Sequence, residues 1–106
     1  MIELLPDADR VVPMLIGGRF VRASDGATLE VTNPATGRQI AQVPSATRDD
    51  VQAAYEAASA AFPSWSKAHP TERAAALRRL ADLVDEHGDE LAALDVMDNG
   101  SPIKEM

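Results

Sequence analysis

The periodicity of the apolar residues changes at Ser45, and this change constrains the fold more than any other feature. Before Ser45, apolar and polar residues alternate in short runs separated by glycine-containing turns, a pattern typical of half-buried β-strands. After Thr47, apolar residues recur at helical spacing over long segments. The sequence therefore predicts paired strands first and amphipathic helices afterwards.

Two hairpins are predicted in the strand-forming part. Gly17-Gly18 separates Leu15-Ile16 from Phe20-Val21, which is the pattern of a two-residue hairpin turn. The segment from Asn33 to Gly37 then connects a second pair of alternating runs. The connection between the two hairpins is predicted at residues 24–27.

The turn from Asn33 to Gly37 has a specific chemistry. Pro34 fixes its own φ angle and disfavours the helical region for Asn33. The Asn33 side chain can bond to the following backbone, and Gly37 can adopt a positive φ without steric cost. The chain is therefore expected to reverse direction here.

The first helix is expected to begin at Thr47, because Asp50 follows three residues later in a capping arrangement. Pro63 is expected to end this helix, since proline interrupts helical hydrogen bonding. The apolar residues of this helix fall on one face, whose alanine-rich part is expected to need a partner beyond the hairpins: Val51, Ala54, Tyr55, Ala58, Ala61 and Phe62.

A second helix is predicted to start at His69-Pro70, since proline suits the first helical position. Gly88 weakens this helix, and Asp89 is expected to cap a continuation that stops at Asn99-Gly100. Its buried stripe is predicted to contain Leu77, Leu80, Ala81 and Val84.

The last residues have the sequence pattern of another helix start. Ser101-Pro102 suits an N-cap and a first helical residue, but only Ile103–Met106 follow, which is one turn where a stable helix needs several. The sequence is therefore interpreted as a truncated chain.

Composition excludes several classes of function. The net charge of −7 argues against nucleic-acid binding, because a phosphate backbone requires a concentrated basic face. No apolar run approaches membrane-spanning length, and the absence of cysteine fits a reducing compartment. We therefore expect a cytoplasmic protein without nucleic-acid or membrane partners, whose residues 1–14 form a flexible leader.

No familiar catalytic or phosphate-binding motif is present in the sequence. His69 lies at a predicted helix start and His87 near a helix end, where capping or dipole interactions account for both. The pairs Asp85-Glu86 and Asp89-Glu90 have an adjacent spacing that does not aim two carboxylates across one bond. Trp65 is predicted to fill the core between the two helices.

In order, these pieces resemble the amino-terminal part of the NAD(P)-dependent aldehyde dehydrogenase family. The resemblance covers Leu15 to Pro102. The segments that carry it are LIGGRFVRA, VTNPATGRQIAQVPSAT, DDVQAAYEAASAAFPSW and HPTERAAALRRLADLVDEHGDELAALDVMDNGSP. It implies an α/β fold of which this chain supplies two β-hairpins and two to three amphipathic helices.

The resemblance also implies an activity. In this family a cysteine thiolate attacks the aldehyde, hydride passes to NAD or NADP, and an activated water releases the carboxylic acid. Those residues belong to later parts of the family's sequence, and this chain contains no cysteine. We therefore assign no catalytic and no cofactor-binding residue here, and expect the chain alone to be inactive and to bind no cofactor.

The expected organisation follows from the resemblance. Residues 15–106 would pack with the cofactor-binding domain, while the catalytic and oligomerisation parts are absent from this chain. The partner would be the remainder of the aldehyde dehydrogenase fold or a full-length relative, and the intact enzyme would be a homo-oligomer.

One site is implied for this segment. Some family members hold a structural monovalent cation with oxygens before the Asn-Pro turn and from the Asp-Asn-Gly aspartate. The matching residues are Val31, Thr32 and Asp98. Hard oxygen ligands suit such an ion.

Two other functions are considered for this chain. A non-catalytic scaffold or interaction module derived from the family would keep the helices and bind a partner. An acidic carrier domain would also fit the charge, but no Asp-Ser-Leu attachment site opens a helix.

Overall fold

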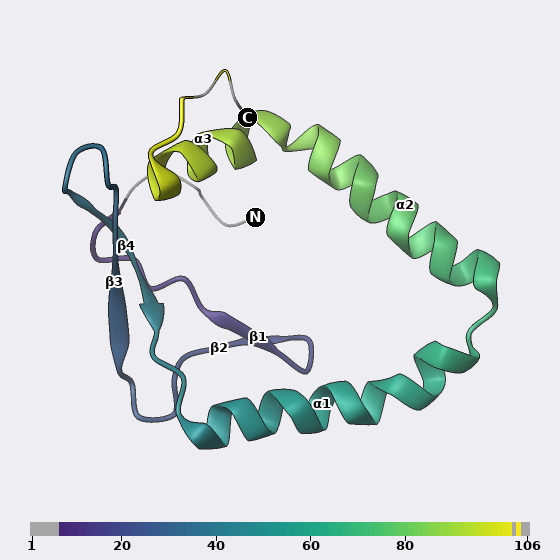
Figure 1. The fold of residues 1–106 in the computed structure, drawn as a ribbon. Helices are drawn as coiled ribbons and strands as arrows, with labels where there is room; N and C mark the ends of the chain where they lie inside the picture. The colour runs from purple at the N-terminus through teal and green to yellow at the C-terminus, as the bar shows by residue number, and fades with distance from the viewer. Residues whose placement is uncertain (1–6, 103, 105–106) are drawn as a thin grey trace.

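The computed structural model describes residues 7–102 and Lys104. Two antiparallel hairpins precede three helices, as predicted (Figure 1). The strands are β1 (Met14–Ile16), β2 (Arg19–Val21), β3 (Thr28–Thr32) and β4 (Gln39–Pro44). The helices are α1 (Arg48–Lys67), α2 (Pro70–Glu86) and α3 (Gly88–Asn99).

Both hairpin turns form where the sequence places them. Gly17 and Gly18 adopt φ angles of 60° and 77°, the left-handed region that a two-residue turn between twisted strands requires. In the second turn, the Asn33 side chain accepts a hydrogen bond from the Ala35 amide at 2.9 Å, and the Gly37 amide donates to the Asn33 carbonyl at 2.8 Å. The predicted Asx turn is therefore confirmed.

Residues 7–12 lie beside β4, in the segment for which a flexible leader was predicted. The Val12 amide donates to the Gln42 carbonyl at 2.8 Å, and the Gln42 amide donates to the Arg10 carbonyl at 2.7 Å. Val11 and Gln42 form a parallel bridge. This part of the leader is therefore hydrogen-bonded to the sheet, while residues 1–6 lie outside the described part of the chain.

Helix α1 starts as predicted but ends later. Thr47 is the N-cap and forms a reciprocal capping box with Asp50. The prediction that Pro63 ends the helix is wrong, because α1 continues to Lys67. A proline removes one amide donor, but the turn after Pro63 is still hydrogen-bonded. The Ala68 backbone amide donates to the Ser64 carbonyl at 3.1 Å, and the Ser64 side-chain hydroxyl donates to the Ala61 carbonyl at 3.0 Å.

Helices α2 and α3 largely follow the sequence prediction. The His69 ring accepts a hydrogen bond from the Thr71 amide at 3.3 Å, which confirms its capping role. Asp89 was expected to cap the continuation, but His87 holds the N-cap position and Asp89 lies within the first turn of α3. Gly100 ends α3 in the left-handed conformation, with φ of 77°. Of the helix expected after Ser101-Pro102, only Lys104 lies within the described residues.

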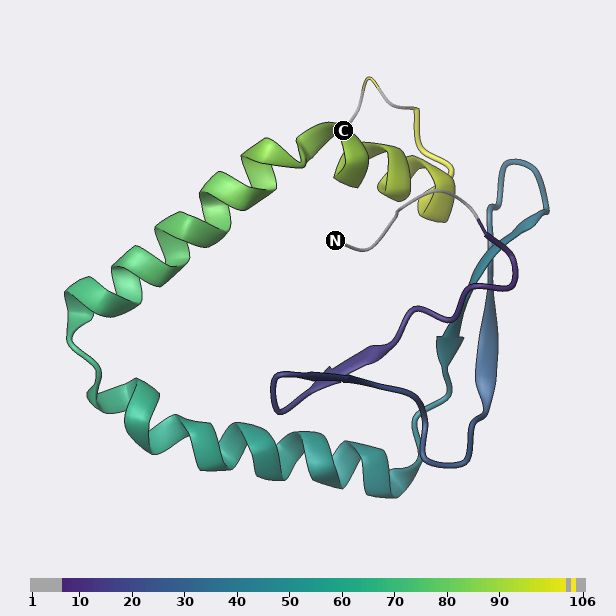
Figure 2. The ribbon, with the colours of Figure 1, turned by 180° about the vertical axis from the view of Figure 1, so that it is seen from behind.

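The elements form an open ring rather than layers around a core (Figures 1 and 2). The first hairpin lies above α1 and contacts it through β1, while α2 and α3 contact each other at the opposite side. Among the described residues, only Ala23 and Ile40 are buried hydrophobic residues. The stripe of α2 that was predicted to be buried is therefore exposed in this chain taken by itself.

Candidate functional site

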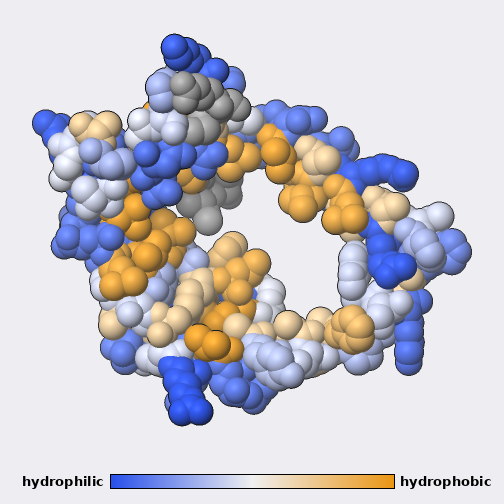
Figure 3. All heavy atoms as spheres, in the orientation of Figure 1, coloured by the Kyte–Doolittle hydropathy of each residue, from blue (hydrophilic) through white to orange (hydrophobic). Residues whose placement is uncertain are grey.

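The inner surface of the ring is apolar and uncovered. Figure 3 shows hydrophobic atoms of α2 and of the first hairpin facing the central opening. Leu77 and Leu80 of α2 are 63% and 57% exposed, and Leu83 and Val84 are also exposed. Side chains of this size stabilise a fold only when a neighbouring surface removes them from water. This inner surface therefore has the character of a docking face for further protein.

Helix α1 presents a broad apolar surface of which the first hairpin covers only part. Its alanines face β1 and the Gly17-Gly18 turn across an open hollow of about 360 Å³. The lining residues are Leu15, Ile16, Gly17, Gly18, Ala54, Ala57, Ala58 and Ala61. Val51, Tyr55 and Phe62 remain exposed.

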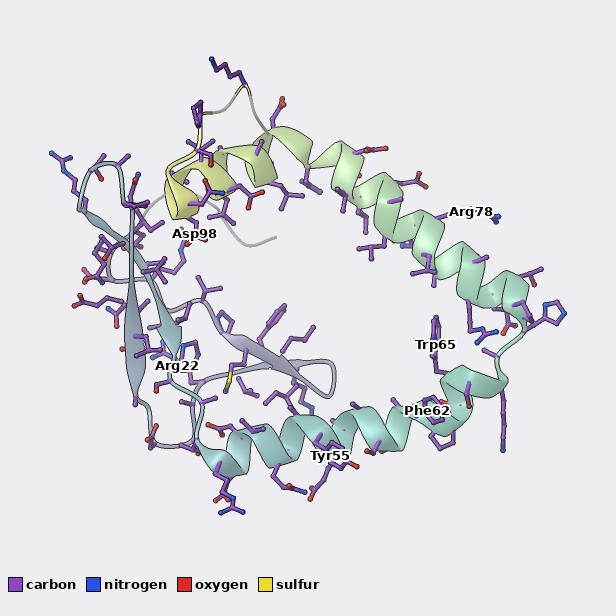
Figure 4. The ribbon with its side chains drawn as sticks, in the orientation of Figure 1. Arg22, Tyr55, Phe62, Trp65, Arg78 and Asp98 are labelled. Atoms are coloured by element: carbon purple, nitrogen blue, oxygen red, sulfur yellow. The ribbon has the colours of Figure 1, made fainter. Side chains whose placement is uncertain are left out.

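Trp65 does not occupy a core between α1 and α2, contrary to the sequence prediction. Its side chain is 49% exposed, and Figure 4 shows it pointing from the end of α1 into the central opening. The two helices diverge from the Ala68 connection, so no facing surface encloses the indole. Trp65 thus belongs to the same uncovered inner surface as the leucines of α2.

Asp50 ties the start of α1 to the loop that follows the first hairpin. Its carboxylate accepts hydrogen bonds from the Thr47 amide at 2.8 Å and from the Ser24 amide at 3.1 and 3.2 Å. The hydroxyl oxygens of Ser24 and Thr47 lie 2.9 Å apart. Asp50 is the buried charged residue of the described chain, at 9% exposure. This Asp50 junction fixes the direction in which α1 leaves the strands.

Hydrogen bonding also sets the ionisation of Asp50. Donation by the Thr47 amide, followed by that of Ser24, holds the pKa of the carboxyl below its ordinary value of 3.8. A carboxyl whose pKa is lower in the folded state stabilises the fold when ionised, above its unfolded-state pKa. That contribution disappears as the pH falls through the folded-state value.

Asp50→Asn is therefore expected to lower the unfolding temperature at neutral pH, because an amide group replaces one of two acceptor oxygens. The difference from the wild type should shrink as the pH falls from about 5 to below 3.8. Thermal unfolding monitored by far-ultraviolet circular dichroism over this pH range measures the difference in unfolding temperature. Asp49→Asn, at the exposed neighbouring position, is the matched control. The same pH-dependent difference in both variants would contradict this role of Asp50.

The end of α3 meets the Asn33-Pro34 turn, although these segments are distant in the sequence. A Cβ atom placed on Gly100 would lie 3.0 Å from Pro34 Cγ and 3.8 Å from the Ala35 nitrogen. Val31 and Thr32 end the strand that enters this turn, and Asp98 lies in the last turn of α3. Figure 4 shows Asp98 on the end of α3 nearest the second hairpin. The three residues predicted as cation ligands thus lie on the two segments that meet at this junction, β3 before the turn and the last turn of α3.

The predicted cation site would consist of oxygen donors, the ligands that hard cations prefer. Asp98 is exposed and offers a carboxylate, while Val31 and Thr32 offer backbone carbonyls beside a bulge in the β3–β4 pairing. Within residues 7–102, no three histidine, aspartate or glutamate side chains cluster as a metal site would require. A cation here would accordingly depend on carbonyl oxygens as well as on Asp98.

Both histidines make local contacts near the start of a helix. His69 caps α2, and its Nδ1 lies 2.7 Å from the Thr71 hydroxyl oxygen. His87 Nδ1 lies 3.6 Å from a Glu90 carboxylate oxygen one turn along α3. Both are local contacts within a few residues of a helix start, so the geometry supports the structural interpretation of both residues.

Two contributors to the junctions were missed by sequence analysis. The capping box marked Asp50, but its bond to the Ser24 amide joins residues 26 positions apart and has no local signal. Ala57 was left out of the predicted apolar face of α1, yet it lies against Gly17. The unbroken run of small residues from Ala57 to Ala61 was the available indication of close approach.

No helix among the described residues combines the length and apolarity that crossing a membrane would require. The helices instead carry charged residues along one side, such as Arg78, which Figure 4 shows pointing away from the ring. The uncovered apolar surface of this chain therefore occupies parts of the helices and of the hairpins, where Leu15, Phe20 and Leu29 are exposed.

Comparison with known proteins identifies the architecture. The model of the aldehyde dehydrogenase family matches residues 20–106. The chain is 48% identical over 89 residues to a phenylacetaldehyde dehydrogenase of Pseudomonas fluorescens, a match that covers 82% of this chain and 18% of that protein. The chain thus spans about a fifth of the length of this curated relative.

Solved structures of longer enzymes contain the same arrangement of elements. An NAD⁺ complex of an aldehyde dehydrogenase from Bacillus cereus superposes with a TM-score of 0.86 at 43% identity, covering 90% of this chain and 20% of that one. An NADP-dependent enzyme of Escherichia coli gives a TM-score of 0.88 at 38% identity, covering 95% and 21% respectively. The open ring of hairpins and helices described above is the amino-terminal piece of that larger fold, and this chain belongs to the aldehyde dehydrogenase family.

Proposed function

We propose that this chain acts as the amino-terminal scaffold of an enzyme that oxidises an aldehyde to a carboxylic acid with NAD or NADP. The supporting observation is the uncovered inner surface of the ring, which exposes Leu77, Leu80 and Trp65 in a segment that matches about a fifth of its relatives. Residues 15–106 would pack beside the cofactor-binding domain of the remaining fold. The complete enzyme would be a homo-oligomer.

The isolated chain is expected neither to oxidise aldehydes nor to bind the dinucleotide. Family chemistry needs a thiolate nucleophile, and the sequence contains no cysteine. The purified chain should therefore produce no NADH or NADPH absorbance above a buffer control with phenylacetaldehyde and either cofactor. NADH formation that scales with protein concentration would disprove this expectation.

The scaffold role itself is tested by a chimera. Residues 20–106 of this chain would replace the matching segment of the phenylacetaldehyde dehydrogenase of Pseudomonas fluorescens. We expect NADH formation within about tenfold of the parent enzyme, because the ring supplies backbone and packing surface rather than reacting groups. The parent enzyme, prepared in parallel, is the control. A soluble, folded chimera without activity would contradict the scaffold proposal.

A non-catalytic module that binds a full-length relative is the second candidate, and the same exposed inner surface supports it. Adding the isolated chain to the parent enzyme distinguishes the two functions. A scaffold that works in its own polypeptide should leave the mass of the parent assembly unchanged, whereas a binding module should increase it. Light scattering after size-exclusion chromatography measures this mass.

We further propose that the carbonyl oxygens of Val31 and Thr32 and the Asp98 carboxylate bind a monovalent cation in the complete fold. Sodium or potassium should then raise the unfolding temperature of the chimera relative to tetramethylammonium at equal ionic strength, because a ligand that binds only the folded state stabilises it. Asp98→Asn should reduce this effect, while Asp95→Asn on the same helix should not. Equal cation effects in the two variants would contradict the assignment.

A further inference from the structure

The outer edge of β4 is occupied by the chain's own leader. Successive residues of a strand direct their backbone groups to opposite edges, so Ala41 and Val43 pair with β3 while Ile40 and Gln42 point the other way. The Gln42 amide donates to the Arg10 carbonyl at 2.7 Å, and the Gln42 carbonyl accepts from the Val12 amide at 2.8 Å. Both outward groups of Gln42 are therefore satisfied by the leader.

A third backbone bond and two side chains extend this contact. The Asp7 amide donates to the Ile40 carbonyl at 3.1 Å. The side-chain amide of Gln39 donates to the Ala8 carbonyl at 2.6 Å, and that of Gln42 reaches the same carbonyl at 3.4 Å. Figures 1 and 2 both show residues 7–12 passing close to β4 before the chain enters β1. The contact is thus a paired strand edge reinforced by glutamine side chains.

An uncovered strand edge attracts other strands. It offers a row of unpaired amides and carbonyls to any extended chain, and natural proteins cover or interrupt such edges to prevent this. Pro44 has no amide donor and interrupts this edge only at the end of β4, and Ile40 and Gln42 carry no charge that would disfavour pairing with another strand. A second copy of this chain presents an identical edge, and two identical edges can pair about a two-fold axis.

We propose that residues 7–12 form an edge strap that covers the outer edge of β4 and keeps a second copy of this chain from pairing there. The strap is held by backbone bonds at Ile40 and Gln42 and by the Gln39 side chain. Removing the strap frees the edge and converts it into a self-association surface. This role is independent of catalysis by the complete enzyme.

Amide hydrogen exchange of the 106-residue chain tests whether the strap is held as described. The Gln42 amide should be protected, and Gln39→Ala should accelerate its exchange about fivefold, the effect of losing one ordinary hydrogen bond. Gln52→Ala, which removes an exposed glutamine bonded to Glu56, is the matched control. Unprotected exchange of Gln42 in the wild type, or equal exchange in the two variants, would overturn the proposal.

The oligomeric state of deletion variants tests what the strap prevents. Deleting residues 1–12 should raise the weight-average mass about twofold through pairing of two β4 edges, whereas deleting residues 1–6 should leave it at the wild-type value. Adding Gln42→Pro to the longer deletion removes the outward amide donor and should restore the wild-type mass. Light scattering at matched concentrations measures all three. Equal masses for the two deletions, or an unchanged mass on adding Gln42→Pro, would refute the edge-strap role.

Discussion

Leu80→Asp is expected to remove at least nine-tenths of the activity of the chimera by preventing α2 from docking. The Leu80 side chain is 57% exposed in this chain and belongs to the uncovered inner surface. If the remaining fold covers this surface, the variant places an unpaired carboxylate in an apolar interface, at a cost of at least about 3 kcal/mol. Thermal melting and NADH formation by the purified chimera measure the loss.

Arg78→Asp provides the control for this prediction. Arg78 lies two residues from Leu80 on α2, and its side chain points away from the ring (Figure 4). The substitution changes the net charge by more than Leu80→Asp does, yet it should alter stability by less than about 0.5 kcal/mol. Equal loss in both variants would trace the effect to charge alone, and full activity of Leu80→Asp would show that α2 has no partner in the complete enzyme.

Gly100→Ala is expected to be the most destabilising single-methyl change among the glycines at turns. Gly100 has φ of 77°, a conformation that costs an alanine about 1–2 kcal/mol. The added methyl would also lie 3.0 Å from Pro34 Cγ, which is closer than carbon atoms pack. The end of α3 or the Asn33 turn must therefore shift. Chemical denaturation of the full chain and of the chimera measures the loss.

Gly37→Ala separates the two contributions to this effect. Gly37 has a similar φ of 70°, but a Cβ atom there would have no neighbour within 4 Å among the described residues. It should therefore cost only the backbone strain, and the excess at Gly100 reports the contact with Pro34. Pro34→Ala removes the Cγ atom, so Gly100→Ala should be less costly in that background. Equal effects at Gly37 and Gly100 would show that the α3 end does not press on the turn.

The local geometry of this chain was largely predictable from sequence. The Gly17-Gly18 turn, the Thr47–Asp50 capping box and the Gly100 helix end each depend on residues within a few positions of one another. The residues themselves restrict the backbone conformations involved, so these turns and caps can be predicted without knowledge of the rest of the fold. Pro63 is the instructive failure, because a single missing donor did not outweigh the hydrogen bonds of the flanking turns.

The family could also be inferred from sequence, because the order and spacing of several weak local signals are jointly specific. The burial of the helices could not be inferred in the same way. An apolar stripe shows that a face requires a partner but does not identify that partner. Trp65 was predicted to fill a core between the two helices, and the structure instead directs α2 and the end of α1 around an open ring.

The sequence by itself therefore determined the strands, helices and turns of this protein and the family to which it belongs. The tertiary structure decided which distant groups meet: Ser24 with Asp50, Gly100 with Pro34, and residues 7–12 with β4. The physical reason is the range of the interactions. Turns and caps are set by short-range sterics and hydrogen bonds, whereas these junctions depend on the directions in which whole elements leave one another.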